Sequence, residues 1–253
     1  MWEIYNDLID AVPRQYTVAE CLAGLSWFLV RSAGVGVAMR PRDGDGPVRS
    51  AGTLAGLKLH ELAAWIKSWN YYEAAMGLAA INSALNAPVI ARQNCGDLLK
   101  PSEDQNLFDA MINEFRGKKV AVIGHFMGVE KLGDKCQLSI LERIPRNGDL
   151  PDPACEYVLR EQDFVIMTAT TLINKTMPRL LQLSRGARVM VAGPSTPLHP
   201  LMFEHGVSVL GGLLVHDEPR VWKAIAEGGH RELFTSGSGM VKVYREKVVE
   251  SRN

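Results

Sequence analysis

Three short polar segments could bind a ligand, and each directly follows a run of four apolar residues. The segments are Gly124–Phe126, Thr168–Thr170 and Gly193–Thr196. They offer threonine and serine hydroxyls, backbone N–H groups and an imidazole, which can donate hydrogen bonds to an anion or transfer protons. Because the carboxyl ends of neighbouring parallel strands meet at one edge of a sheet, we expect the three segments to line one site.

The segment after the first of these strands is not the dinucleotide-binding fingerprint. Gly-x-Gly-x-x-Gly would need glycine at two positions where the chain has Phe126 and Val129. A nucleoside could still stack on Phe126. Glu142 closes the next apolar run, where an acid that binds a ribose is expected. A nucleoside cofactor such as S-adenosylmethionine, bound through Glu142 and used by a transferase, is therefore one alternative.

The other two segments have both structural and functional interpretations. Thr168 and Thr170 could cap the next helix, or they could donate to an anion at its N-terminus, and both can hold at once. Ser195 lies in a segment that resembles a nucleophile elbow only loosely. Gly-x-Ser-x-Gly would place glycine where Pro197 stands, and this difference disfavours a hydrolase.

Binding of a metal or a metal-associated ligand is the first hypothesis, to which the nucleoside cofactor is the alternative. The sequence contains neither His-Glu-x-x-His nor Cys-x-x-Cys, so no standard zinc spacing is present. His125 and His199 follow different apolar runs and could meet across neighbouring strand ends. If Glu73 also converges there, the three side chains offer the nitrogen and oxygen donors that suit a transition metal. We therefore name His125, His199 and Glu73 as predicted metal ligands.

The rest of the chain must position these segments. The second half alternates apolar runs with helical patterns, which is typical of βαβ units on a parallel sheet. Residues 18–39 are rich in bulky and β-branched residues broken by glycine, and they predict an antiparallel meander. Residues 58–67 and 71–85 predict two helices. The sequence thus predicts an α/β protein with a small α+β domain at 1–98 and a parallel-sheet domain at 99–253.

Three further segments concern how these parts are joined. Residues 86–102, with scattered proline and glycine, predict a linker. Residues 240–244 alternate in polarity and predict an edge strand that closes the sheet. Residues 40–49 contain three arginines among turn residues, which indicates a solvated loop, with an anion clamp as the alternative.

The composition limits the classes of partner and of cellular location that we expect for this protein. Lysine and arginine number 28 and are balanced by 28 acidic residues, so no global field favours nucleic acid or an anionic membrane. The four cysteines are widely spaced and indicate free thiols. The longest apolar stretches are interrupted well before the roughly 20 residues that cross a bilayer, and no signal-peptide pattern opens the chain. We expect a cytoplasmic protein without nucleic-acid or membrane partners. The sequence leaves open whether the protein forms a homo-oligomer.

The chain resembles the "putative heavy-metal chelation" family, whose function is unknown. The resemblance rests on the stretches Ser68–Glu73, Gly77–Asn82, Ile123–Phe126, Thr168–Thr176 and Gly193–Leu198. It implies an N-terminal domain similar to the capping domain of enolases, then a Rossmann-like domain, with a site in the cleft between them. Enolases hold their catalytic carboxylates and metal in a barrel domain that is missing here, so only the shape carries over.

Together, the residues and the resemblance lead us to expect a small anionic or metal-associated ligand between the two domains. The predicted ligand-binding residues are Asn70, Glu73 and Asn82 from the N-terminal helices, and Gly124, His125, Phe126, Glu142, Thr168, Thr170, Gly193, Ser195 and Thr196 from the strand ends. The cofactor would be a metal ion or a nucleoside. The sequence leaves open whether the protein is an enzyme.

Overall fold

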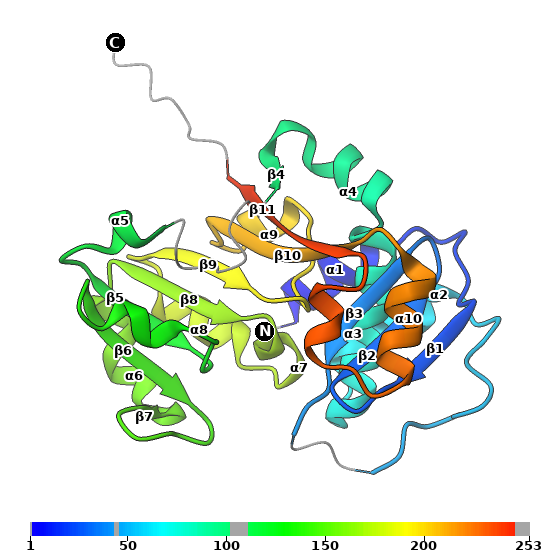
Figure 1. Ribbon diagram of the computed structural model, residues 1–253, viewed down its shortest axis with the longest axis horizontal. Coiled ribbons are helices and arrows are strands. Elements are labelled where there is room, and N and C mark those ends of the chain that lie inside the picture. Colours follow the sequence, from blue (N-terminus) through cyan, green and yellow to red (C-terminus); the bar gives the residue numbers. More distant parts are fainter. Residues whose placement is uncertain (1, 43–45, 102–110, 246–253) are drawn as a thin grey trace.

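The apolar runs of the second half form one large sheet (Figure 1). In the computed structural model, which describes residues 2–42, 46–101 and 111–245, this sheet has eight strands. In sheet order they are β4 (Leu99–Pro101), β11 (Ser238–Tyr244), β10 (Val209–Val215), β9 (Arg188–Ala192), β8 (Phe164–Thr168), β5 (Lys119–Ile123), β6 (Gln137–Glu142) and β7 (Leu150–Pro151). The strands from β10 to β7 run parallel, whereas β11 is antiparallel to both of its neighbours. The predicted parallel sheet is confirmed.

Most helices that connect these strands are short. They are α5 (Ile112–Phe115), α6 (Cys155–Val158), α7 (Thr170–Ile173), α8 (Met177–Leu183), α9 (Leu201–Glu204) and α10 (Glu218–Ala226), with 3-10 turns η4 (Val129–Leu132), η5 (Asp152–Ala154), η6 (Leu159–Glu161) and η7 (Arg231–Phe234). Their apolar residues pack on the two faces of the sheet. Strands buried on both faces read as continuous apolar runs, which is why the sequence pattern was clear.

The first part of the chain forms the predicted antiparallel meander. Its strands are β1 (Glu20–Ala23), β2 (Trp27–Arg31) and β3 (Val35–Met39). Its helices are α1 (Glu3–Asp10), α2 (Leu59–Ala63), the 3-10 turn η1 (Ala64–Lys67) and α3 (Tyr71–Leu85). Helix α3 is buried along its length from Glu73 onward. Such a helix belongs to the core of the molecule rather than to its surface.

Both faces of the three-stranded sheet are covered. Phe28 and Val30 pack with α3 on one face, as expected for alternating side chains of a strand. Trp27 and Leu29 point to the other face and share a core with Ile225 of α10, which lies beside β2 in Figure 1. A helix from the second half of the chain therefore completes the core of the first half.

The segment between the two parts is not an irregular linker. It forms α4 (Pro88–Cys95), the 3-10 turn η2 (Gly96–Leu98) and β4, and position 102 lies outside the described residues. Strand β4 pairs with β11 on its outer side, so β11 is not an edge strand. Both predictions are wrong, because a three-residue strand has no periodicity to detect. The boundary at 98/99 stays a prediction.

Among the described residues, no single helix is both long and apolar enough to cross a membrane. Two consecutive helical segments meet the length and composition criteria only when they are combined, and their axes are bent by 72° relative to each other; they are residues 71–85 and 88–98.

Candidate functional site

A large cleft opens at the carboxyl edge of the eight-stranded sheet. Its volume is about 1820 Å³, and residues of both halves of the chain line it. The strand order reverses between β5 and β8, which is the point where ligands bind in open α/β sheets. Gly124 has φ +95°, and a Cβ added there would lie 3.0 Å from Cγ2 of Thr168. The first and second polar segments therefore touch at the reversal point.

Eight of the twelve predicted ligand-binding residues line this cleft. They are Gly124, His125, Phe126, Glu142, Thr168, Thr170, Gly193 and Ser195. The structure thus brings the three strand-end segments together. The other four, Asn70, Glu73, Asn82 and Thr196, are not among the lining residues, and each has a different position described below.

His125 connects three loops at one side of the cleft. Its backbone N–H donates to Oε2 of Glu142 at 2.7 Å. Its ring lies between two carboxylates, with Nδ1 3.0 Å from Oδ2 of Asp149 and Nε2 2.8 Å from Oε1 of Glu130. The side chain is only 9% exposed. The hydrogen bond with Glu130, and then that with Asp149, raises the pKa of His125. A protonated ring has no lone pair for a metal.

The stabilisation from His125 is expected to depend on pH. The folded-state pKa lies above the unfolded value of about 6.5, so the stabilisation is complete below that pH and is lost as pH rises through the folded pKa. The pKa of Glu130 is lowered by the bond to His125, so its share is lost on acidification. The unfolding free energies of the wild type and His125→Gln should differ by on the order of 1 kcal/mol below about pH 6.5 and converge as the pH rises above the raised folded-state pKa.

Urea titrations at a series of pH values measure this difference. Glu130→Gln serves as the matched variant, because it removes one carboxylate and keeps the ring. It should show a weaker pH dependence of the same sign. A difference that grows above pH 7 would contradict the charged arrangement.

Glu142 uses both carboxylate oxygens to shape the backbone. Oε2 accepts from the N–H of His125, and Oε1 accepts from the N–H of Arg143 at 2.9 Å. The residue therefore fixes the turn after β5 against the end of β6. A ribose would have to compete with these bonds, so the geometry does not favour the nucleoside alternative.

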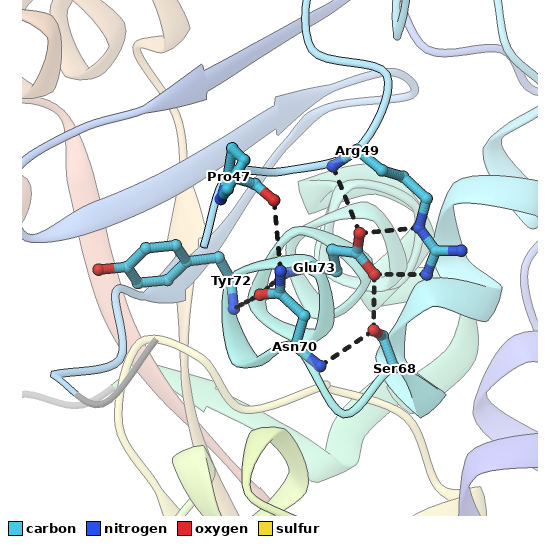
Figure 2. A network of polar contacts seen from close by, with 6 residues as sticks. All are labelled: Pro47, Arg49, Ser68, Asn70, Tyr72 and Glu73. Atoms are coloured by element: carbon cyan, nitrogen blue, oxygen red, sulfur yellow. Dashed lines mark hydrogen bonds and ion pairs between the residues drawn. The ribbon is translucent and has the colours of Figure 1, made fainter. Parts of the chain in front are cut away.

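Glu73 is held in an ion pair at the start of α3 (Figure 2). Its carboxylate accepts from both Nε and Nη2 of Arg49, with Nε at 2.7 Å, and from Oγ of Ser68 at 2.6 Å. The side chain is 6% exposed. The bond from Arg49 is the main cause that lowers the pKa of Glu73. The carboxylate is thus ionised and engaged, rather than open to a metal.

Asn70 caps the same helix. Its Oδ1 accepts from the backbone N–H of Tyr72 at 2.9 Å, and its Nδ2 donates to the carbonyl of Pro47 at 3.3 Å (Figure 2). Capping satisfies N–H groups that lack a partner in the first turn. Together with Glu73, it holds the segment 46–49 on α3. Arg40 and Arg42, at the other end of the same connection, line the cleft, and residues 43–45 lie outside the described chain.

Two asparagines hold the loop after β9: Asn82 in α3, and Asn86, which caps the C-terminal end of that helix. Nδ2 of Asn82 donates to the carbonyls of Val37 at 2.8 Å and Ser195 at 2.9 Å. Nδ2 of Asn86 donates to the carbonyl of Thr196 at 2.9 Å. Sequence reasoning missed Asn86, although two asparagines four residues apart in an apolar helix signal buried partners.

Two atoms of this contact have no partner. Oδ1 of Asn82 and Oγ1 of Thr196 are buried and lack a hydrogen bond to any described residue. Ser195 differs, because its Oγ accepts from the N–H of Met39 at 2.8 Å and the residue also lines the cleft. Its hydroxyl hydrogen therefore stays available to a ligand.

The three predicted metal ligands do not assemble. His199 uses Nδ1 to accept from the N–H of Leu201 at 3.2 Å, and burial lowers its pKa. Neither His199 nor Glu73 lines the cleft, and His125 contacts carboxylates. Within 2–42, 46–101 and 111–245, no group of three or more His, Cys, Asp or Glu side chains could hold a metal ion. The described residues therefore do not fit a tightly coordinated divalent cation.

Basic residues predominate in the cleft, although the whole chain is balanced. The described lining includes Arg40, Arg42, Arg92, Lys100, Lys131, Arg143, Arg146, Arg231 and Lys242, against Asp97, Glu130, Glu142 and Asp152. The elements after β5 and β8, η4 and α7, have four residues each. Such short elements carry little of a helix dipole, so attraction for an anion must come mainly from these side chains.

The comparisons with known proteins agree on one family. Residues 106–244 match DUF364 and residues 5–85 match DUF4213, and both are described as "putative heavy-metal chelation". An uncharacterized protein of Methanocaldococcus jannaschii is 28% identical over 154 residues, which are 58% of this chain and 56% of that protein.

Two solved structures are similar over nearly the whole chain. A protein with unknown function from the DUF364 family of Desulfitobacterium hafniense is 40% identical with a TM-score of 0.90, covering 97% of this chain and 99% of that one. A DUF364-family protein with unknown function from Pyrococcus horikoshii is 19% identical with a TM-score of 0.78, and the match covers 96% of this chain and 98% of that one. At this identity the likeness is evidence for the fold only. The chain therefore belongs to the DUF364 family.

Proposed function

We propose that this protein binds a metal in anionic form, as an oxyanion or an anionic complex, in the cleft at the carboxyl edge of the large sheet. The observation that carries the proposal is the excess of nine basic over four acidic residues in the described lining. A cleft lined by one sign of charge raises the local concentration of the opposite ion. The family description supports a metal, and the charge supports its anionic form.

The side chains at the strand ends would orient such an anion. Thr168 and Thr170 share one hydrogen bond of 3.1 Å between their hydroxyls, so one of the two hydroxyl hydrogens stays free for a ligand. Ser195 offers another. Arginine would contribute paired N–H donors that match an oxyanion. A bare divalent cation would instead meet repulsion in this lining.

We also infer that the halves correspond to the two shapes that the resemblance implies. A three-stranded antiparallel sheet packed on α2 and α3 supports an enolase-cap-like unit. A parallel sheet whose order reverses beside its first strand supports a Rossmann-like unit. The cleft between them would be the shared site.

Isothermal titration with molybdate, tungstate, zinc and nickel tests the proposal. An oxyanion should bind, and its affinity should fall as salt rises. Arg42→Gln combined with Arg92→Gln removes two exposed cleft charges and should weaken binding on the order of tenfold, or about 1.4 kcal/mol.

The control pair is Arg116→Gln with Arg185→Gln, which makes the same change in net charge at exposed positions outside the described lining. This pair should bind the oxyanion nearly as the wild type does. Binding of zinc or nickel without any oxyanion, or equal weakening by the two pairs, would refute the anionic form.

A further inference from the structure

Lys175 has a backbone conformation that lysine rarely adopts. It follows α7 immediately after the capping residue Asn174, and its φ is +68°. Glycine is usual at this position, because a Cβ makes the left-handed conformation less favourable. Only Ser50 shares a positive φ among the non-glycine residues that the structure describes.

The amine of Lys175 is buried without a carboxylate. The residue is 9% exposed, and Nζ donates to the carbonyl of Ile173 at 2.5 Å. The ring centroids of Tyr71 and Trp69 lie 5.8 and 6.0 Å from Nζ. No ion pair joins this amine to an acidic side chain of the described chain. One of its possible donor positions is thus used, and only by a neutral group.

Burial favours the neutral form of this amine over its charged form. Burial lowers the pKa of Lys175 to about 8. A lower pKa gives this amine a larger neutral fraction at neutral pH than an ordinary lysine has. The neutral form carries the lone pair that attacks a carbonyl carbon, and desolvation is one of the ways in which enzymes activate lysine.

Several residues around the amine line the cleft. Of its three neighbours in space, Ile173 and Tyr71 line the cleft and Trp69 does not, and both neighbours in sequence, Asn174 and Thr176, line it. Lys175 itself is not a lining residue, so its role toward a ligand requires the flexible four-carbon stem to turn away from the carbonyl of Ile173 and toward these lining residues. The basic lining would concentrate anionic compounds beside it.

We propose that Lys175 is a reactive amine that captures an anionic carbonyl compound, such as a 2-oxo acid or a phosphorylated aldehyde, as an imine. The nitrogen lone pair attacks the carbonyl carbon and forms a C–N bond. The carbonyl oxygen takes up both amine hydrogens and leaves as water, which gives C=N without oxidation or reduction. The inference goes beyond metal binding and does not require a metal in the cleft.

Labelling with pyridoxal phosphate, an aldehyde that carries an anion, tests this role. The full-length protein is incubated at a series of pH values, reduced with borohydride and analysed by peptide mass spectrometry. Lys175 should be modified on the order of tenfold faster than the exposed Lys118 and Lys135, with a midpoint near pH 8. Inorganic phosphate should slow its modification, and pyridoxal without phosphate should react more slowly.

The matched variants separate reactivity from a structural role. Lys175→Arg keeps the positive charge and cannot form the imine, so the rapid adduct should disappear while Lys118 and Lys135 react as before. Lys175→Gly relieves the backbone and should fold. Modification of Lys175 in the native wild type no faster than that of Lys118 would overturn the proposal, and so would modification seen only after denaturation. Neither outcome depends on whether an oxyanion binds.

Discussion

Gly36→Ala is expected to lower the free energy of unfolding by at least about 3 kcal/mol, or to prevent folding. Gly36 lies in β3, where it pairs with Val30 of β2. A Cβ there would be 2.0 Å from the carbonyl oxygen of Ala79 and 2.1 Å from the backbone nitrogen of Ser83. Both atoms belong to the backbone of α3, which cannot turn aside as a flexible side chain can. The helix would have to move away from the sheet.

Urea denaturation measures this effect, and Gly186→Ala is the control. Gly186 has an ordinary φ, and nothing lies within 4 Å of an added Cβ. That substitution should change the unfolding free energy by less than about 0.5 kcal/mol, or raise it slightly by restricting the unfolded chain. A Gly36→Ala protein within 1 kcal/mol of the wild type would mean that α3 does not pack against β3 at this distance.

The fold was predictable from the sequence where a local residue pattern is enough to identify an element. Strands β5, β8, β9 and β10 are buried on both faces and read as apolar runs. Strand β2 does so too, because it contacts α3 with one face and α10 with the other. Strand β4 could not be found in the same way, because its pairing with β11 depends on backbone bonds between distant segments. Local propensity carries no information about such partners.

The residues of the candidate site were likewise predictable only in part. The strand-end segments line the cleft because their place follows from sheet geometry alone. The roles of polar residues on helices were harder to predict. The sequence shows that Glu73 and Asn82 are polar, but it does not show which groups they contact. Arg49 engages Glu73, and Asn82 bonds to the loop after β9. The carboxylates around the ring of His125 come from two other segments, and no spacing indicated them.

Asn86→Ala is expected to cost about 3 kcal/mol of stability and to loosen the cleft as well. Asn86 is 3% exposed, and its amide donates to the carbonyl of Thr196 and accepts from the N–H of Leu198 at 2.8 Å. Truncation leaves these buried backbone groups without partners, each at a cost of about 1–3 kcal/mol. The same loop carries Ser195 into the cleft, so its displacement should also weaken oxyanion binding.

The control is Ser83→Ala in α3, one turn before Asn86. Among the residues that the structure describes, the hydroxyl of Ser83 bonds only to the carbonyl of Ala80, within α3, so its loss should cost less than about 1 kcal/mol. Asn86→Asp keeps Oδ1 for Leu198 but turns a carboxylate oxygen toward the carbonyls of Thr196 and Leu213 in a buried site, so near neutral pH it should be at least as destabilising as Asn86→Ala. Urea titration and oxyanion calorimetry on the same samples decide the matter. If Asn86→Ala lost stability but bound the oxyanion as tightly as the wild type, the loop after β9 would hold the fold together without shaping the ligand site.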